Sequence, residues 1–198
     1  LELTDVTVNG KHGTLTQMEE NEDWTLSDRT PVPSTTGNYA LRFDGTNDYT
    51  TVIHTDKLNI GDNFTFEFWA KSKTASQSQA WIIKKNDSYG IYTKSGNHLN
   101  ISTWGEDADF GANTYIIDDS WHHYTIAGTK GKGVNLYIDG VFIKSVSGSY
   151  TPNAGSQSLY IGGVPSDTKN PNLQVDNLII WNKTLALADI QNTINRMR

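Results

Sequence analysis

The chain has 198 residues with a formal net charge of -6 and no cysteine, which excludes disulfide bonds and thiolate metal sites. An acidic surface repels phosphate backbones, so nucleic acid is not expected as a partner. No stretch approaches the roughly 20 apolar residues that a membrane-spanning helix needs, so membrane insertion is not expected either.

The first elements that the pattern predicts are a surface loop and a hairpin. Residues 1–38 are the least regular part of the chain, and residues 27–38, SDRTPVPSTTGN, carry the proline, serine and threonine typical of a surface loop. Residues 39–52, YALRFDGTNDYTTV, predict a strand, a tight Asp-Gly turn and a second strand.

Period-two alternation of apolar residues is the strongest signal in the chain. In residues 63–71, NFTFEFWAK, the phenylalanines point to one face while Thr65, Glu67 and Trp69 point to the other. Residues 133–146, GVNLYIDGVFIKSV, alternate in the same way before an Asp-Gly pair, which predicts a second hairpin. Further strands are expected at residues 80–85, 89–94, 98–104, 121–128, 158–163 and 175–181.

The C-terminal segment has a helical pattern instead. In residues 184–197, Leu187, Ile190 and Ile194 recur at helical spacing, which predicts one short amphipathic helix. About a dozen short strands and this closing helix predict a single all-β domain over residues 1–198, a two-sheet antiparallel jelly-roll sandwich. Its expected core includes Phe64, Phe66, Phe68, Leu136, Ile138, Leu178 and Ile180.

Six segments, taken in order and spacing, resemble the laminin-G-like, concanavalin-A-like lectin/glucanase domains. They are HGTL, ALRFDGTNDY, FTFEFWAK, WHHYTIAGTKGKGVNLYIDG, LYIGG and VDNLIIWNKTLALADI, and they extend from His12 to Ile190. The resemblance implies two curved antiparallel sheets, one of them concave. It also implies a sugar or a protein as ligand and, in many members, a structural calcium ion.

The Asp-Gly turn is the candidate calcium site. Asp44, Asn47 and Asp48 bring three oxygen-bearing side chains close together. A turn role explains the stretch by itself, because Gly45 supplies a left-handed conformation and Asp44 caps the turn. The acidic ladder of an EF-hand loop is missing, so a calcium ion needs further ligands. The resemblance implies that oxygens near Asp44 and Gly45 join the carboxylate of Asp176, which would pin the two ends of the domain together.

The segment WGEDADFG is the main candidate for a sugar site. The carboxylates of Glu106, Asp107 and Asp109 lie between Trp104 and Phe110, and carboxylates so close repel one another unless solvent or a cation relieves them. Such a segment can offer an aromatic platform beside carboxylates that accept hydrogen bonds from hydroxyls or that hold a calcium ion at the rim. The alternative is an acidic solvated loop whose aromatic side chains pack against the edge of the core. Trp81, Tyr89, Tyr92 and Tyr115 are candidate neighbours in the same sugar site.

A third candidate lies opposite the apolar face of the longest strands. Glu67, Trp69, Trp121 and His123 can line the floor of a groove if that sheet is the concave one. The alternative is that covering segments leave Glu67 and His123 as buried polar partners of one another.

Catalysis is not expected from this chain. Related sandwich glucanases place two Glu and an Asp at alternate positions of one concave strand, and retaining hydrolysis needs paired carboxylates about 5 Å apart. Glu67 stands alone between Thr65 and Trp69. The carboxylates of WGEDADFG are predicted to lie in a loop with the wrong alternation.

The sequence therefore predicts a non-catalytic, carbohydrate-binding, lectin-like module with a structural calcium ion, secreted or exposed on a surface, whose partner is a polysaccharide or another glycan. The alternative is a structural or adhesion domain that binds a protein, as on a virion or a cell surface. The six tryptophans and nine tyrosines favour sugar, although several of them must belong to the core. The fold alone does not decide between the two.

Overall fold

The computed structural model describes residues 2–3, 13–16, 24–26, 39–75, 79–103, 105–165 and 167–197. The expected surface loop at residues 27–38 and the candidate sugar-binding residue Trp104 lie outside the described residues.

Strands dominate the described chain. They are β1 (Glu2–Leu3), β2 (Gly13–Thr16), β3 (Trp24–Leu26), β4 (Tyr39–Asp44), β5 (Tyr49–Val52), β6 (Asn63–Lys71), β7 (Ala80–Lys85), β8 (Tyr89–Lys94), β9 (His98–Thr103), β10 (Glu106–Asp109), β11 (Trp121–Thr129), β12 (Gly133–Ile138), β13 (Val141–Val146), β14 (Leu159–Ile161) and β15 (Asn172–Trp181). A short 3-10 helix, η1 (Asp56–Leu58), follows β5, and the helix α1 (Leu187–Met197) follows β15.

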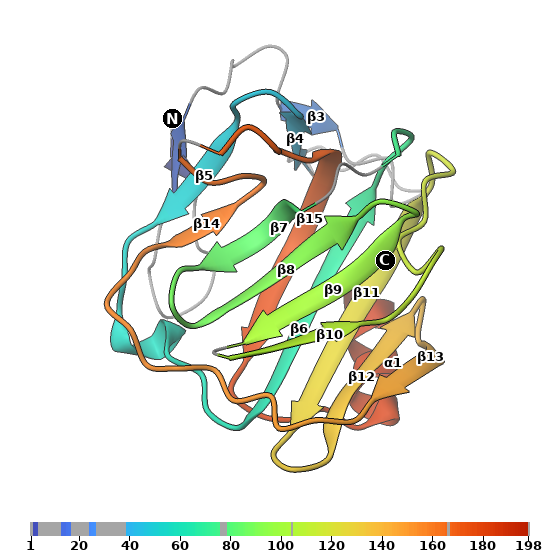
Figure 1. Ribbon diagram of the computed structural model, residues 1–198. Helices are drawn as coiled ribbons and strands as arrows, with labels where there is room; N and C mark the ends of the chain where they lie inside the picture. The colour runs from blue at the N-terminus through green and yellow to red at the C-terminus, as the bar shows by residue number, and fades with distance from the viewer. Residues whose placement is uncertain are drawn as a thin grey trace.

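The strands form two antiparallel sheets that stack as layers (Figure 1). One sheet has eight strands in the order β1-β2-β5-β14-β7-β8-β9-β10, and the other has seven in the order β13-β12-β11-β6-β15-β4-β3. This arrangement confirms the predicted all-β, two-sheet jelly-roll sandwich with one short helix. Consecutive strands pair in β7-β8-β9-β10 and in β11-β12-β13, but each sheet also pairs strands far apart in sequence, as β5 does with β14 and β4 with β15.

The core lies between the sheets, as the alternation predicts. Phe64, Phe66 and Phe68 of β6 are fully buried, and Leu136 and Ile138 of β12 are buried as well. The other two expected core residues, Leu178 and Ile180, are only partly buried and pack against the edge of this cluster. The reason is a register shift in β15 between Asp176 and Ile179, where Asn177 adopts a positive φ of 48°.

Helix α1 covers the outer face of the seven-stranded sheet. Ile190 and Ile194 of α1 form a second apolar cluster with Trp69 of β6 and Leu185, which precedes the helix. The predicted helix spacing is confirmed, and the helix begins at Leu187. No helix of the described chain packs in this way against the outer face of the eight-stranded sheet.

Candidate functional site

Alternation along β7 to β10 divides the eight-stranded sheet into a core face and an outer face. Trp81 lies opposite Tyr92, Tyr92 opposite Asn100, and Asn100 opposite Asp109. Residues that lie directly opposite one another across antiparallel strands share a face, so these four form one row on the face opposite the core. Trp81 and Asp109 at the ends of the row are partly exposed, whereas Tyr92 and Asn100 between them are buried, with 2% and 0% of their surface exposed. The neighbouring row, Ile83, Ile91, Ile101 and Ala108, is buried in the core.

The indole of Trp81 lies against this outer surface. Its ring centre is 4.7 Å from that of Tyr92. A Cβ added to Gly90 would come within 2.5 Å of Cζ3 of Trp81, so the missing side chain of Gly90 makes room for the indole. The ammonium of Lys84 lies 4.4 Å from the centre of the Trp81 ring, which is a cation–π distance. Trp81 is partly exposed, although Gly90, Tyr92 and the Lys84 ammonium all lie against its indole.

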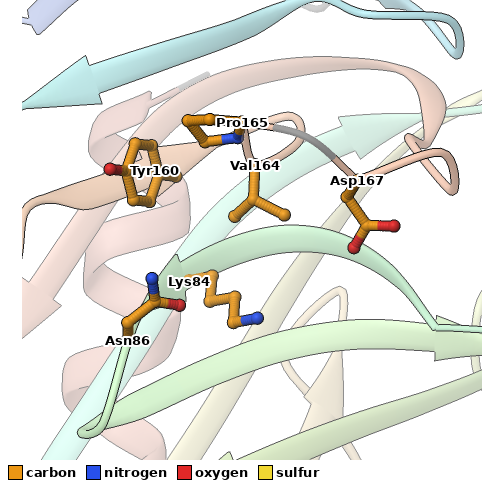
Figure 2. Close-up of a pocket in the computed structure, with 6 residues that line it drawn as sticks. All are labelled: Lys84, Asn86, Tyr160, Val164, Pro165 and Asp167. Atoms are coloured by element: carbon orange, nitrogen blue, oxygen red, sulfur yellow. The ribbon is translucent and has the colours of Figure 1, made fainter.

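Lys84, whose ammonium lies over the Trp81 ring, also lines a pocket of about 280 Å³, and Figure 2 shows the residues around it. Lys84 of β7 and Tyr160 of β14 are directly paired across the two strands and therefore share the outer face. The segment that follows β14 completes the pocket, and the lining residues are Lys84, Asn86, Tyr160, Val164, Pro165 and Asp167. The ring of Tyr49 contacts that of Tyr160 edge to face at 6.2 Å, which supports the wall of the pocket from β5.

Sequence reasoning did not assign these pocket residues. The alternation in SLYIGG, with Leu159 and Ile161 buried and Tyr160 between them, was a signal that could have placed Tyr160 on the outer face. Asp167 and Pro165 belong to an irregular segment with no periodicity, so only the folded chain reveals their position.

The acidic segment forms a strand and not the predicted loop. Residues Glu106–Asp109 make up β10, which pairs with β9, and Ala108 is fully buried in the core. Because Ala108 points inward, Asp107 and Asp109 both belong to the outer face. Asp107 accepts a hydrogen bond from the hydroxyl of Tyr92 at 3.2 Å through Oδ2, so this carboxylate joins the row that begins at Trp81.

Asp109 is held by three donors at the edge of the outer face. His98 Nδ1 and the Gly111 N–H each lie 2.7 Å from Oδ1, and Lys94 Nζ lies 3.7 Å from Oδ2. Burial by itself raises the pKa of the Asp109 carboxyl, but the hydrogen bonds from Gly111 and His98, with the charge of Lys94, outweigh it and hold the pKa below its ordinary value. Asp109 therefore remains an acceptor at neutral pH.

Of the aromatic residues assigned to the sugar site, Tyr92 is buried on the face opposite the core, with 2% of its surface exposed, and three others belong to the core itself. Phe110, Tyr89 and Tyr115 are all buried in the main apolar cluster. Tyr89 donates its hydroxyl hydrogen bond to the carbonyl of Leu58 at 3.0 Å. Tyr89 and Tyr92 are separated by three positions on one strand, so they must point to opposite faces. For Phe110, the alternative of packing against the core is correct.

The structure does not bring Asp176 to the Asp44–Gly45 turn. Asp44 pairs with Asn172 on β15, and Asn172 Nδ2 donates to the carbonyl of Asp44 at 2.8 Å. Asp176 lies four residues further along the strand, roughly 13 Å away, where it pairs with Trp69 of β6. These three predicted ligands are therefore too far apart to surround one ion.

The turn itself is stabilised by its own hydrogen bonds. Gly45 has a φ of 87°, as the turn role requires. The Thr46 N–H donates to Asp44 Oδ1 at 2.6 Å, and the Asp44 N–H donates to Asp48 Oδ2 at 2.8 Å. No group of three or more His, Asp or Glu side chains suited to a metal ion is found in the part of the chain that the structure describes.

Glu67 and His123 lie buried beneath α1. Glu67 Oε2 accepts a hydrogen bond of 2.6 Å from Trp181 Nε1, and Oε1 lies 3.8 Å from Nε2 of His123. Burial raises the pKa of Glu67 to about 7, partly offset by the bond from Trp181 and reinforced by the charge of Asp189. Trp69 packs beside them in the α1 cluster, with Trp121 at its margin, so this face is a covered polar interior and not an open groove.

The arrangement matches one family of sandwich domains. The model of the concanavalin A-like lectin/glucanases superfamily, of laminin G type, matches residues 44–191. The chain belongs to this superfamily. The match confirms the resemblance that the six sequence segments indicate.

Solved structures share the fold at low identity. The binding domain of Paraclostridial Mosquitocidal Protein 1 has a TM-score of 0.73 and 18% identity, over 98% of this chain and 49% of that one. A structure titled for the dependence of botulinum neurotoxin type C cell entry on two ganglioside molecules has a TM-score of 0.70 and 18% identity, over 100% and 51%. The present chain thus spans about half the length of these toxin chains.

A third structure matches over nearly its entire length. Domain 4 of AbnA, a GH43 extracellular arabinanase from Geobacillus stearothermophilus, was solved in complex with arabinotriose, with a TM-score of 0.70 and 20% identity over 96% of this chain and 92% of that one. No curated protein sequence matches the chain. Among the described residues, no helix has the length and apolar character needed to cross a bilayer.

Proposed function

We propose that this domain is a non-catalytic carbohydrate-binding module. Its ligand surface is the outer face of the eight-stranded sheet, from the pocket beside Tyr160, across Trp81, to Asp107 and Asp109. The observation that carries the proposal is the partly exposed indole of Trp81, which lies against the sheet next to a pocket of about 280 Å³. Aromatic platforms with a few convergent polar groups are typical of small-molecule sites.

The chemistry of this surface suits a sugar. The C–H face of a sugar ring is apolar and can stack on the Trp81 indole, while Asn86, Asp107 and Asp167 offer hydrogen-bonding groups to hydroxyls. Removing about 100 Å² of apolar surface from water contributes roughly 2.5 kcal/mol. One or two such platforms, less the cost of immobilising a flexible glycan, leave about 4–6 kcal/mol, which corresponds to a Kd from about 1 mM to tens of micromolar.

The carboxylates argue for binding without catalysis. A glycosidase needs a carboxylic acid with a raised pKa beside a second carboxylate. Glu67 has the raised pKa, but it is buried beneath α1 on the other sheet. Asp107 and Asp109 do occupy alternate positions of one strand, yet the pKa of Asp109 is lowered, so Asp109 does not serve as a general acid.

The structural neighbours support the proposal that the partner is a glycan and that it is met outside the cell. Structural neighbours are described with arabinotriose and with gangliosides, and one of them is a domain of an extracellular enzyme. We infer a secreted or surface-exposed location for this domain on the same ground. The calcium ion that the sequence suggests remains part of the proposal, either at the Asp44–Gly45 turn or near Asp176.

Affinity electrophoresis in gels that contain soluble polysaccharides tests the proposal. Trp81→Ala and Tyr160→Ala are expected to weaken retention at least several-fold, with melting temperatures recorded for each variant. Phe142→Ala is the matched control, because Phe142 is an exposed aromatic residue on β13 of the other sheet. Equal retention of all three variants and wild type on every polysaccharide that binds would contradict the assignment of the site.

A second candidate function rests on the edge strand β13. Val141, Phe142 and Ile143 are exposed next to one another at the free edge of the seven-stranded sheet. An exposed apolar edge strand is a template for pairing with another chain. A protein-binding or adhesion role would therefore use this edge. Concentration-dependent association in analytical ultracentrifugation that Phe142→Lys abolishes, together with no glycan binding, would favour it.

A further inference from the structure

We propose that the pocket beside Tyr160 selects sugars that carry a carboxylate, and that Lys84 is the residue that binds this carboxylate. The inference rests on the proposed glycan-binding function and adds the class of ligand and the residue that sets the specificity.

The first observation is the environment of the Lys84 ammonium. Its interaction in the described chain is with the Trp81 ring at 4.4 Å, and no carboxylate of the described residues lies within ion-pair distance of it. Two other lysines do pair with carboxylates: Lys94 lies 3.7 Å from Asp109, and Lys130 lies 2.5 Å from Asp62. Lys183 resembles Lys84, with its ammonium 5.2 Å from the Trp181 ring, but it does not line the pocket. In a chain with 22 acidic and 16 basic residues, the Lys84 ammonium is therefore a local positive charge in the pocket that can attract an anionic ligand.

The second observation is how the pocket distributes charge. Lys84 reaches along the pocket from β7, whereas Asp167 enters from the segment after β14 (Figure 2). One oxygen of Asp167 already accepts a hydrogen bond from the Lys169 N–H at 3.1 Å, which fixes the carboxylate. A ligand carboxylate is attracted to Lys84 and repelled by Asp167, while a ligand hydroxyl can donate to Asp167. The two charges together specify the orientation of an acidic sugar.

The third observation is the position of the aromatic rings around this cation. Trp81 lies on one side of Lys84, and Tyr160 is paired with Lys84 across β7 and β14. A sugar ring that stacks on either aromatic side chain therefore has its substituents within reach of the ammonium. The rings also lower the local dielectric constant, which strengthens the attraction between Lys84 and a carboxylate. Binding of a carboxylated sugar should consequently weaken as ionic strength rises.

Two pairs of probes distinguish the sources of the carboxylate. The first pair is trigalacturonic acid and its methyl ester, which differ in charge alone apart from the methyl groups. The second pair is 3′-sialyllactose and lactose. Isothermal titration calorimetry with wild type is expected to give at least about ten-fold tighter binding of the charged member of one or both pairs, since a hydrogen bond to a charged group has this order of effect. Whichever pair shows the difference identifies the sugar acid.

Three variants assign the effect to Lys84. Lys84→Gln keeps most of the stem and removes the charge, and it is expected to abolish the preference for the charged member. Lys84→Arg keeps the charge and should retain the preference. Lys132→Gln is the control, because Lys132 is an exposed lysine in the turn between β11 and β12, away from the pocket. A melting temperature within a few degrees of wild type shows that each variant is folded.

The outcomes separate this inference from the proposed function. Equal binding of charged and uncharged probes by wild type, or a Lys84→Gln variant that keeps the preference, overturns the role of Lys84 but leaves glycan binding in place. Binding of none of these probes and of no polysaccharide in the gels overturns both.

Discussion

Trp181 donates a hydrogen bond from its indole Nε1 to Oε2 of Glu67 at 2.6 Å, across 114 residues of sequence. Glu67 is central in β6 and Trp181 ends β15, so this bond joins two neighbouring strands beneath helix α1. His123 on β11 and Asp189 on α1 are the titratable groups that face the same carboxyl. Burial dominates, and the pKa of Glu67 rises to about 7.

The raised pKa predicts a pH-dependent stability. The folded state binds the Glu67 proton more tightly than the unfolded state, whose pKa is 4.5, so the stabilising contribution is complete below about 4.5 and is lost as pH rises through about 7. The loss amounts to at most about 3 kcal/mol. Glu67→Gln keeps an acceptor for Trp181 and cannot ionise. Its melting temperature relative to wild type should therefore increase between pH 5 and pH 8, and parallel pH profiles would contradict the assignment.

Removal of a central core side chain should cost much of the stability. Phe66 is fully buried and contacts the rings of Phe64 at 5.6 Å and Tyr89 at 5.2 Å. We expect Phe66→Ala to lower the free energy of unfolding by about 3–5 kcal/mol in denaturant melts. Tyr39→Ala, at an exposed aromatic position on β4, serves as the control. A loss below about 1 kcal/mol for Phe66→Ala would be inconsistent with this core.

Gly90 offers a way to displace the platform without removing it. A Cβ at this position would lie 2.5 Å from Trp81 Cζ3, so Gly90→Ala should force the indole away from the sheet. We expect weaker polysaccharide retention than wild type and a blue- or red-shifted tryptophan emission spectrum. Ser102→Ala, which changes the residue directly opposite Gly90 on β9, is the matched control. Unchanged retention in Gly90→Ala would show that stacking on Trp81 is not needed.

Trp104 remains a sequence-based prediction. It directly follows β9 and comes two residues before β10, which carries Asp107 and Asp109. We expect Trp104→Ala to weaken retention several-fold with little change in melting temperature. If the substitution instead unfolds the domain, Trp104 is a core residue, as Phe110 proved to be.

Thermal melts can test whether a calcium ion binds and which of its proposed ligands holds it. Asp44 and Asp176 lie roughly 13 Å apart along the paired strands, too far to bind one ion together. Millimolar calcium, compared with chelator, is expected to raise the melting temperature by several degrees through ligand linkage. Only one of Asp44→Asn and Asp176→Asn should remove that increase. Identical melts with calcium and with chelator would exclude a structural calcium ion.

The sequence predicts a strand, and which of its side chains point into the core, most reliably when one face of that strand is buried. The phenylalanines of β6 are an example, because each points into the core and any slip in register would expose them all. Alternation was less informative for β10, where Ala108 is the one apolar residue among carboxylates, so a strand looked like a loop.

Pairing between distant segments was the part that sequence could not supply. The prediction that Asp176 adjoins Asp44 failed by four positions, because β15 begins at Asn172 and a register shift follows Asp176. The pairing of distant strands also decides whether an aromatic residue lies in the core or on a surface open to a ligand. Tyr89 and Trp81 are both aromatic strand residues, but only the sheet order decides which one the second sheet covers.

The position of β15 also constrains how the polypeptide folds during translation. Strands β4 and β6 are near neighbours in sequence, yet β15 is inserted between them in the sheet. At about 5–20 residues per second, translation completes β15 roughly 6–24 s after it reaches the start of β6. During that interval the apolar strand β6 has an unpaired edge, open to contacts with other nascent chains. The seven-stranded sheet therefore closes only after translation has passed Trp181, and ribosome-associated chaperones have that interval in which to act.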